Sequence, residues 1–205
     1  LDNALIRENF QRNFALKKLH EVNDNDLILI NDLDEIPELK NFSYKNKITI
    51  FKQRMLYFKF NLVYKNLSWT GSKICKKKDL ISPQWLRNIK TRKYPLWRLD
   101  IFFSKKKYNN IEIIENGGWH FTNIKTADEI HHKMKSFLHH FEYENSGLNP
   151  EMIEKLIKDK KALYNYNADQ RDNKWSNNTE LEKINLEFLP DYINENLDKY
   201  QNWLS

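Results

Sequence analysis

Two aspartates, Asp32 and Asp34, follow directly after the four apolar residues 27 to 30. Such an apolar run is typical of a buried, parallel strand, and the loop beyond its carboxyl end lies where an α/β sheet opens to ligands. Residues two apart on an extended backbone point to the same side, so we expect both carboxylates to reach one ion. Carboxylate oxygens suit Mg²⁺ or Mn²⁺, which proteins hold through one or two carboxylates together with substrate phosphate oxygens.

An Asp-rich loop can also do no more than turn the chain, and an isolated D-x-D triplet favours that interpretation. Here the triplet is preceded by the apolar run and followed by Glu35-Ile36-Pro37, which makes a longer and rarer pattern. We therefore predict a metal site in which the ion neutralises the charge that grows on a departing diphosphate.

A second unusual segment is Gly117-Gly118-Trp119-His120-Phe121, which contains two of the four glycines of the chain. Paired glycines allow close approach of the backbone or a positive φ angle. The Trp119 indole can form an apolar platform in a donor or acceptor pocket, and His120 can serve as a third metal ligand or as a donor to phosphate. The alternative, a tight turn with a core tryptophan and a hydrogen-bonded histidine, stays open.

The residues around these segments predict the elements that position them. Residues 4 to 20 carry apolar side chains at every fourth position and predict an amphipathic helix. Strands are expected at 27–30 and 111–114, and residues 48–51 together with the period-two pattern of 56–62 are expected to form the strands of a more exposed, hairpin-like region.

Three further helices are predicted in the second half of the chain. Thr126 and Glu129 have the spacing of a capping box, and the helix that follows has apolar residues at helical spacing: Ile130, Met134, Phe137, Leu138 and Phe141. Asn149-Pro150 and Pro190 begin the other two. The order of elements predicts an α/β fold with a mixed sheet and a helical C-terminal part, in one domain over residues 1 to 205. Because nucleotide-binding α/β domains begin with a strand, we expect the first βα units upstream of residue 1, so this piece alone should bind UDP weakly or not at all.

The composition excludes a disordered chain, since 40% of the residues are apolar and 14% aromatic. No apolar run is long enough to cross a bilayer, so we expect no transmembrane segment. A formal net charge of +6 favours anionic partners without choosing among them, and the single cysteine fits a reducing compartment. We predict a cytoplasmic protein and leave a peripheral membrane location open.

Several of these segments together resemble glycosyltransferase family 17, the bisecting N-acetylglucosaminyltransferase family, over nearly the whole chain. Arg7-Glu8 with Gln11-Arg12 resembles its R-E-x-x-Q-R helix, and residues 27 to 37 resemble its apolar strand followed by S-D-x-D-E-I-P, with Asn31 in place of Ser. Trp69-Thr70-Gly71 resembles the W-x-G segment of the family, and residues 118–121 resemble its G-W-H-[FC] segment. The family's next helix is matched by Ile130, Lys133 and Ser136. Its closing pattern, P-x-Y-x-x-x-N-x-x-x-[FY], is matched by Pro190, Tyr192, Asn196 and Tyr200.

The resemblance implies a GT-A fold, a divalent metal, UDP-N-acetylglucosamine as donor, inversion at the anomeric carbon, and βα units ahead of the R-E-x-x-Q-R helix. A carboxylate must then take the proton of the acceptor hydroxyl, and Asp128 and Glu142 are the candidate bases. Arg7 is a candidate to compensate phosphate charge, although Glu8 and Arg12 also form an ordinary i,i+4 pair. The acceptor is expected to be a glycan or glycoconjugate.

Two other functions compete with this prediction. A basic, aromatic-rich nucleic-acid-binding module would explain the net charge, but 28 acidic residues are scattered among the basic ones and no nucleic-acid motif occurs, so we expect no nucleic-acid partner. A degenerate transferase would bind the sugar nucleotide without turnover. Protection from thermal unfolding by metal and UDP-sugars distinguishes these possibilities.

Overall fold

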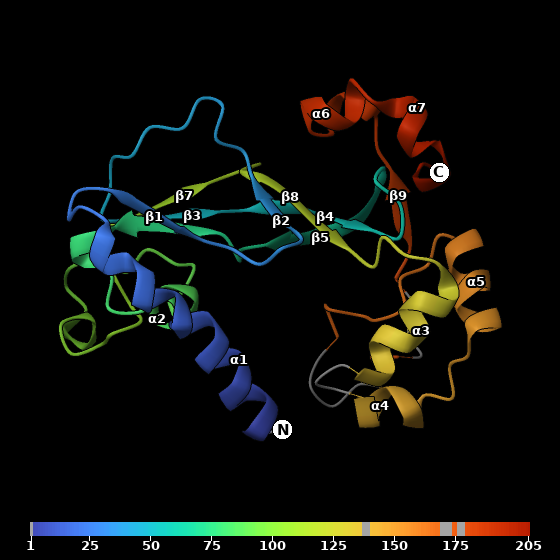
Figure 1. The fold of residues 1–205 in the computed structure, drawn as a ribbon, viewed down its shortest axis with the longest axis horizontal. Coiled ribbons are helices and arrows are strands. Elements are labelled where there is room, and N and C mark those ends of the chain that lie inside the picture. The colour runs from blue at the N-terminus through green and yellow to red at the C-terminus, as the bar shows by residue number, and fades with distance from the viewer. Residues whose placement is uncertain (1, 137–139, 169–173, 176–178) are drawn as a thin grey trace. The chain divides into compact units, whose positions relative to one another are not determined.

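The protein has a mixed α/β fold in two compact units (Figure 1). The computed structural model describes residues 2–136, 140–168, 174–175 and 179–205. The N-terminal unit comprises Asp2–Gln53 and Trp69–Gly118, and the C-terminal unit comprises Arg54–Ser68 and Trp119–Ser205. The α/β class is therefore confirmed, while the expectation of one transferase domain with a GT-A fold stays a prediction.

The sheet of the N-terminal unit has the strand order β1-β6-β3-β7. Strand β6 (Lys73–Lys76) pairs antiparallel with both β1 (Leu27–Ile30) and β3 (Ile48–Phe51), and β3 pairs parallel with β7 (Ile111–Ile114). The strand expected over residues 27 to 30 is confirmed, its burial is confirmed in part because Ile28 is buried, and its expected parallel orientation is wrong. Strand β1 pairs antiparallel with β6 and stands at the end of the strand order, with Ile28 buried and Leu27 exposed.

Two helices lie on the same side of this sheet in Figure 1, α1 (Asp2–Phe14) and α2 (Pro83–Asn88). The predicted helix over 4–20 is confirmed as α1, which continues as the 3-10 helix η1 (Ala15–Glu21). Helix α2 begins where the Ser82 hydroxyl accepts a hydrogen bond from the backbone of Trp85, and Trp85 and Leu86 pack into the core with Ile48 and Ile50. The remaining elements are β2 (Glu35–Pro37), η2 (Lys77–Asp79) and η3 (Leu99–Ile101).

The C-terminal unit contains four neighbouring strands in the order β8-β4-β5-β9. These are β8 (Gly118–Thr122), β4 (Gln53–Tyr57), β5 (Leu62–Trp69) and β9 (Leu181–Lys183). Strand β4 is parallel to β8, and β5 is antiparallel to β9. The helical elements are α3 (Ala127–Ser136), α4 (His140–Asn145), α5 (Pro150–Lys158), η4 (Leu186–Phe188), α6 (Asp191–Asn194), α7 (Leu197–Tyr200) and η5 (Gln201–Trp203).

Successive side chains along a strand point to opposite sides, and consecutive residues of β4 are buried. Strand β4 is therefore covered on both faces. Met55 and Tyr57 belong to the core cluster that contains Ile130 of α3 and Ile153 of α5. Leu56 packs in a separate cluster with Trp119, Leu189 and Ile193. The prediction of a more exposed hairpin is therefore wrong for β4, and also for β3, whose four residues are all buried. The period-two pattern also ends early, since Phe58 takes a positive φ of 63° and residues 59 to 61 connect β4 to β5.

The predicted helix beginnings are confirmed for α3 and α5. The backbone N–H of Thr126 donates to Glu129 Oε2 at 2.9 Å and that of Glu129 donates to Thr126 Oγ1 at 3.4 Å, which is a capping box. Asn149 Oδ1 accepts from the backbone of Met152 at 2.8 Å. Phe137 and Leu138, expected in the first of these helices, lie outside the described residues. The helix expected after Pro190 is divided into α6 and α7.

None of the helices in the described part of the chain has both the length and the apolar character that crossing a bilayer requires.

The thiol of Cys75 provides a test of the N-terminal sheet. Cys75 lies on β6 between two antiparallel neighbours, is fully buried, and has a pKa that burial raises from 9.0 to about 12. Because the thiolate is the reactive form, a disulfide reagent at pH 8 should label Cys75 only after urea unfolds the unit. Rapid labelling of the native protein would contradict the placement of β6 in the centre of the sheet.

Candidate functional site

Asp32 faces an open cleft in the N-terminal unit. The cleft has a volume of about 380 Å³ and is bounded by α1, η1, the end of β1 and the start of α2. Its polar lining residues are Glu8, Gln11, Arg12, Asn31 and Asp32. Thus residues from the R-E-x-x-Q-R pattern and from the D-x-D pattern, which are about 20 positions apart, line the same cleft. The Asp32 side chain is 40% exposed and accessible from it.

Between Asp32 and Glu35 the backbone turns instead of remaining extended. The N–H of Glu35 donates to the carbonyl of Asp32 at 3.1 Å, and the N–H of Asp32 donates to Glu35 Oε2 at 3.0 Å. The period-two argument for two carboxylates on one side therefore does not apply to this loop. Leu33 at the tip of the turn is fully exposed, and Asp34 is half-buried and is not among the described residues that line the cleft.

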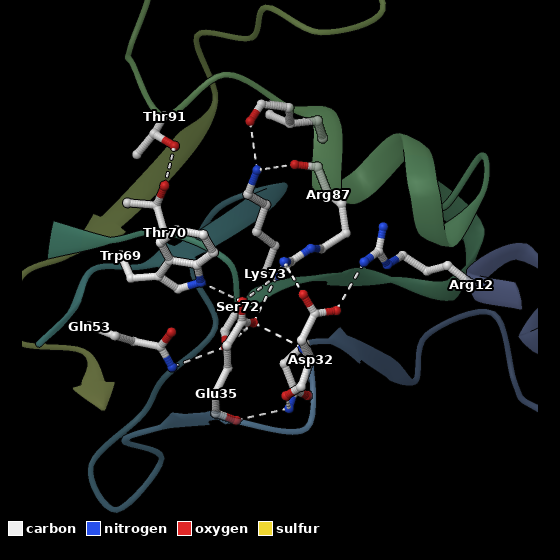
Figure 2. A network of polar contacts seen from close by, with 12 residues as sticks. Arg12, Asp32, Glu35, Gln53, Trp69, Thr70, Ser72, Lys73, Arg87 and Thr91 are labelled. Atoms are coloured by element: carbon white, nitrogen blue, oxygen red, sulfur yellow. Dashed lines mark hydrogen bonds and ion pairs between the residues drawn. The ribbon is translucent and has the colours of Figure 1, made fainter. Parts of the chain in front are cut away.

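The Asp32 carboxylate is held by two arginines from different helices (Figure 2). Oδ1 accepts from Arg12 Nη2 of α1 at 3.0 Å, and Oδ2 accepts from Arg87 Nη2 of α2 at 2.7 Å. Arg12 also binds Glu8 Oε1 at 2.9 Å and the side-chain oxygen of Gln84. Burial opposes the charge of Arg12, but the carboxylates of Asp32 and Glu8 outweigh it and raise its pKa. Arg12, and not Arg7, is thus the arginine of α1 that contacts the acidic loop.

Glu35 is the buried centre of this polar network. Its side chain has 0% exposure, and both oxygens accept from Arg87 Nη1, at 2.9 and 2.8 Å. Oε1 also accepts from Trp69 Nε1 at 2.5 Å, and Oε2 accepts from Ser72 Oγ at 3.2 Å. A buried carboxylate is tolerated only when it is paired and hydrogen-bonded, and Glu35 meets both conditions. Arg87 therefore connects Glu35 in the interior with Asp32 at the cleft.

The segment Trp69-Thr70-Gly71 has a structural role in the same network. Trp69 donates to Glu35, and a Cβ atom at Gly71 would lie 1.7 Å from Glu35 Oε1 and 2.4 Å from Arg87 Nη1. No side chain fits there while the ion pair is in place. The W-x-G pattern is thus explained by the space that the Glu35–Arg87 pair requires.

Lys73 fixes the end of the helix that carries Arg87. Its Nζ donates to the carbonyls of Arg87 at 2.5 Å and Ile89 at 2.7 Å, with 3% of the residue exposed. Burial lowers its pKa from 10.5 to about 8, and the nearby positive charge of Arg87 acts in the same direction. A cation bound to the last carbonyls of a helix stabilises its C-terminus, so Lys73 positions Arg87 from below.

The glycine pair places two backbone segments of the N-terminal unit against each other. Gly118 has a φ of +127°, and a Cβ atom there would lie 2.1 Å from the carbonyl oxygen of Ile36 on β2. The carbonyl of Gly117 accepts from the N–H of Glu38 at 2.9 Å. The expected positive φ is confirmed for Gly118, and its backbone closely approaches the segment just beyond the acidic loop, while close approach to a ligand stays a prediction.

Trp119 and His120 belong to the C-terminal unit and are buried on β8. The indole N–H of Trp119 donates to the carbonyl of Phe188 at 2.6 Å, and its ring packs with Leu56, Leu189 and Ile193. These contacts correspond to the core tryptophan of the alternative interpretation. The roles of Trp119 and His120 in a donor pocket, and of His120 as a metal ligand, stay predictions.

The two candidate bases are exposed carboxylates of the C-terminal unit. Asp128 lies in the first turn of α3 and lines a hollow of about 530 Å³ with residues at the start of α5, among them Asn149 and Glu151. Glu142 lies in the first turn of α4. Arg7 is exposed on α1. Sequence reasoning missed Arg87 and Lys73, which lie outside all of the patterns; the signal was Gly71, whose need for space points to a large buried partner.

Within the described residues, no group of three or more His, Cys, Asp or Glu side chains is arranged to hold a metal ion.

Replacing Glu35 tests the buried centre of the network. Glu35→Gln should lower the free energy of unfolding by about 3 kcal/mol, because it removes the charge that compensates Arg87 in the interior. Gly71→Ala should act in the same direction through its collision with Glu35. Urea denaturation measures both, and Glu38→Gln, an exposed carboxylate in the same loop, is the control with an expected change within about 0.5 kcal/mol. Equal stability of the Glu35 and Glu38 variants would contradict the network.

Lys73 predicts a particular dependence of stability on pH. Between pH 8 and 10.5 the unfolded chain keeps the proton that folded Lys73 has lost, so this residue makes stability rise with pH in that interval. Below pH 8 both states are protonated and the contribution is constant. Lys73→Met should remove the rise, while Cys75 contributes equally to both proteins. Urea denaturation of both proteins between pH 7 and 10 measures the difference, and parallel profiles would refute the buried, shifted lysine.

No family model, no curated protein and no solved structure matches this chain. The resemblance of its short patterns to glycosyltransferase family 17 therefore stays an interpretation.

Proposed function

We propose that the chain is an inverting, metal-dependent glycosyltransferase of the GT-A type, with UDP-N-acetylglucosamine as donor and a glycan hydroxyl as acceptor. One observation carries the proposal: the cleft of about 380 Å³ brings Glu8, Gln11 and Arg12 of α1 together with Asp32 of the acidic loop. A carboxylate and a guanidinium side by side in an open cleft are the groups that recognise a metal-bound diphosphate.

The residues present fit a divalent ion that arrives with phosphate. Each Asp32 oxygen accepts one arginine hydrogen bond, and a carboxylate has about four lone-pair sites, so positions remain on the exposed side. Asp32 and Asp34 of the acidic loop are the proposed ligands of this ion. Two guanidinium groups within 3.0 Å of Asp32 oppose a dication there, and the negative charge of a diphosphate offsets that repulsion. When bound, the ion supplies Lewis-acid neutralisation of the leaving diphosphate.

The residues of the chain itself position and neutralise the donor. Arg12 lines the cleft and can turn one N–H toward a phosphate oxygen while the rest of its guanidinium stays on Asp32. Arg87 is held by Glu35 and by Lys73 beneath it, so its contact with Asp32 fixes the carboxylate in one orientation. This preorganisation keeps the site from rearranging during the reaction.

The proton of the acceptor hydroxyl requires a base of moderate strength. Asp128, in the first turn of α3, and Glu142, in the first turn of α4, are the proposed bases. In an inverting reaction this carboxylate deprotonates the acceptor as its oxygen attacks the anomeric carbon and the nucleoside diphosphate departs.

Ligand-dependent protection from unfolding tests the donor site. We expect Mn²⁺ alone and UDP-N-acetylglucosamine alone to change the melting temperature little, and both together at millimolar concentration to raise it. An increase of about 3 to 6 °C is expected when the ligand is at ten times its dissociation constant. Release of UDP in the presence of oligosaccharide acceptors separates turnover from binding alone.

The matched variants are Asp32→Asn and Asp24→Asn. Both remove one aspartate charge that pairs with a basic side chain, but only Asp32 lies in the cleft. Asp32→Asn should abolish the joint effect of metal and donor, and Asp24→Asn should retain it. The proposal fails if no UDP-sugar protects the protein in the presence of metal, or if both variants respond as the original chain does.

A further inference from the structure

A basic segment of the N-terminal unit, residues 90–107, carries an unusual charge. It contains seven basic residues and one acidic residue, Asp100, so its formal charge of +6 equals that of the whole chain. The basic residues are Lys90, Arg92, Lys93, Arg98, Lys105, Lys106 and Lys107. The other 187 residues are therefore balanced in charge. The positive character of this protein is concentrated in less than a tenth of its length.

The same segment exposes large apolar side chains to solvent. Trp97 is 79% exposed and Phe103 is 91% exposed, and Leu96, Leu99 and Phe102 are also exposed. Aromatic residues are normally buried, and a group of them in one short segment marks a surface that contacts another apolar phase. Lysine and arginine stems around such side chains place their charges at the same surface.

The base of the segment is tied to the core of the unit, so the exposed residues lie on an ordered turn. Trp85 Nε1 donates to the carbonyl of Lys105 at 2.7 Å, the N–H of Lys90 donates to the carbonyl of Lys106 at 2.9 Å, and Ile101 is buried. The 3-10 turn η3 (Leu99–Ile101) ends at this buried residue. The one acidic residue of the segment, Asp100, is bound by Arg98 and Lys107, each at 2.7 Å. Its charge is already included in the formal charge of +6.

We propose that residues 90–107 form a docking surface for an anionic phospholipid membrane, in which Trp97, Phe102 and Phe103 enter the interface and the surrounding lysines and arginines contact lipid phosphates. A bilayer is the partner because it alone offers a negative surface directly above an apolar phase, which matches both halves of the segment. This inference is independent of the proposed transferase activity. The proposed contact involves only the surface of the membrane, and it needs no segment that spans the bilayer.

Sedimentation with vesicles tests the surface, using the full chain and vesicles of phosphatidylcholine with or without 30% phosphatidylglycerol. We expect binding to the anionic vesicles and little to phosphatidylcholine alone, with weaker binding at high salt because the charges are screened. Lys105→Glu with Lys106→Glu should reduce partitioning by at least about tenfold. The control replaces two exposed lysines of α5, Lys155→Glu with Lys158→Glu, which changes the net charge by the same amount. This control should reduce partitioning only slightly, through the general change in net charge.

The apolar contribution has its own matched pair, since Phe102 and Phe10 are both 68% exposed. Phe102→Ala should weaken vesicle binding several-fold and Phe10→Ala should leave it unchanged. Quenching of tryptophan fluorescence by brominated lipid gives a second readout, and because the chain has six tryptophans the quenching is assigned to Trp97 by its loss in Trp97→Phe. The proposal is overturned if the chain ignores anionic vesicles, if Phe102→Ala binds them fully, or if Trp97→Ala instead abolishes self-association, which would make the surface a contact between copies of the chain.

Discussion

A negative charge placed out of reach of water governs the N-terminal unit. Glu35 is fully enclosed, and an isolated carboxylate in that position would be prohibitively unstable. Arg87 compensates it from α2, Trp69 and Ser72 complete its hydrogen bonds, and Gly71 leaves the space that the pair occupies. The position of α2 against the sheet therefore follows from the need to deliver one guanidinium to one carboxylate. The neighbouring Asp32 gains its orientation from the same arginine.

The elements with a local signal were predictable. Helix α1, strands β3 and β7, and the capped starts of α3 and α5 each have a periodic pattern or a capping residue within a few positions. Strand β6 has no such signal, because buried Lys73 interrupts its apolar pattern. The parallel orientation expected for β1 was wrong, since four apolar residues indicate burial without specifying the direction of the neighbouring strand.

The candidate site was predictable in its acidic residues and not in their partners. The D-x-D pattern identified Asp32, but the arginine expected from the R-E-x-x-Q-R pattern was Arg7, whereas Arg12 of the same pattern is the one that contacts Asp32. The prediction could not identify Arg87, because an ion pair between residues 52 positions apart has no spacing rule that marks it in a sequence. The turn at Asp32–Glu35 was also missed. It depends on the carboxylate of Glu35 reaching inward to accept the N–H of Asp32, and that is a tertiary effect.

The wide sequence separation of the network has a consequence for how the unit folds. The pairs Arg12–Asp32, Asp32–Arg87 and Glu35–Arg87 join positions 20, 55 and 52 residues apart. Chain entropy must be lost before contacts of this range can form, so local helices and hairpins precede them. Glu35 must therefore remain hydrated until α2 docks, and the acidic loop takes its final shape in the last stage of assembly. During synthesis, a nascent chain in which residue 87 has not yet emerged holds an uncompensated carboxylate at Glu35. Its N-terminal segment should stay accessible to proteases and chaperones until α2 has been made and has docked.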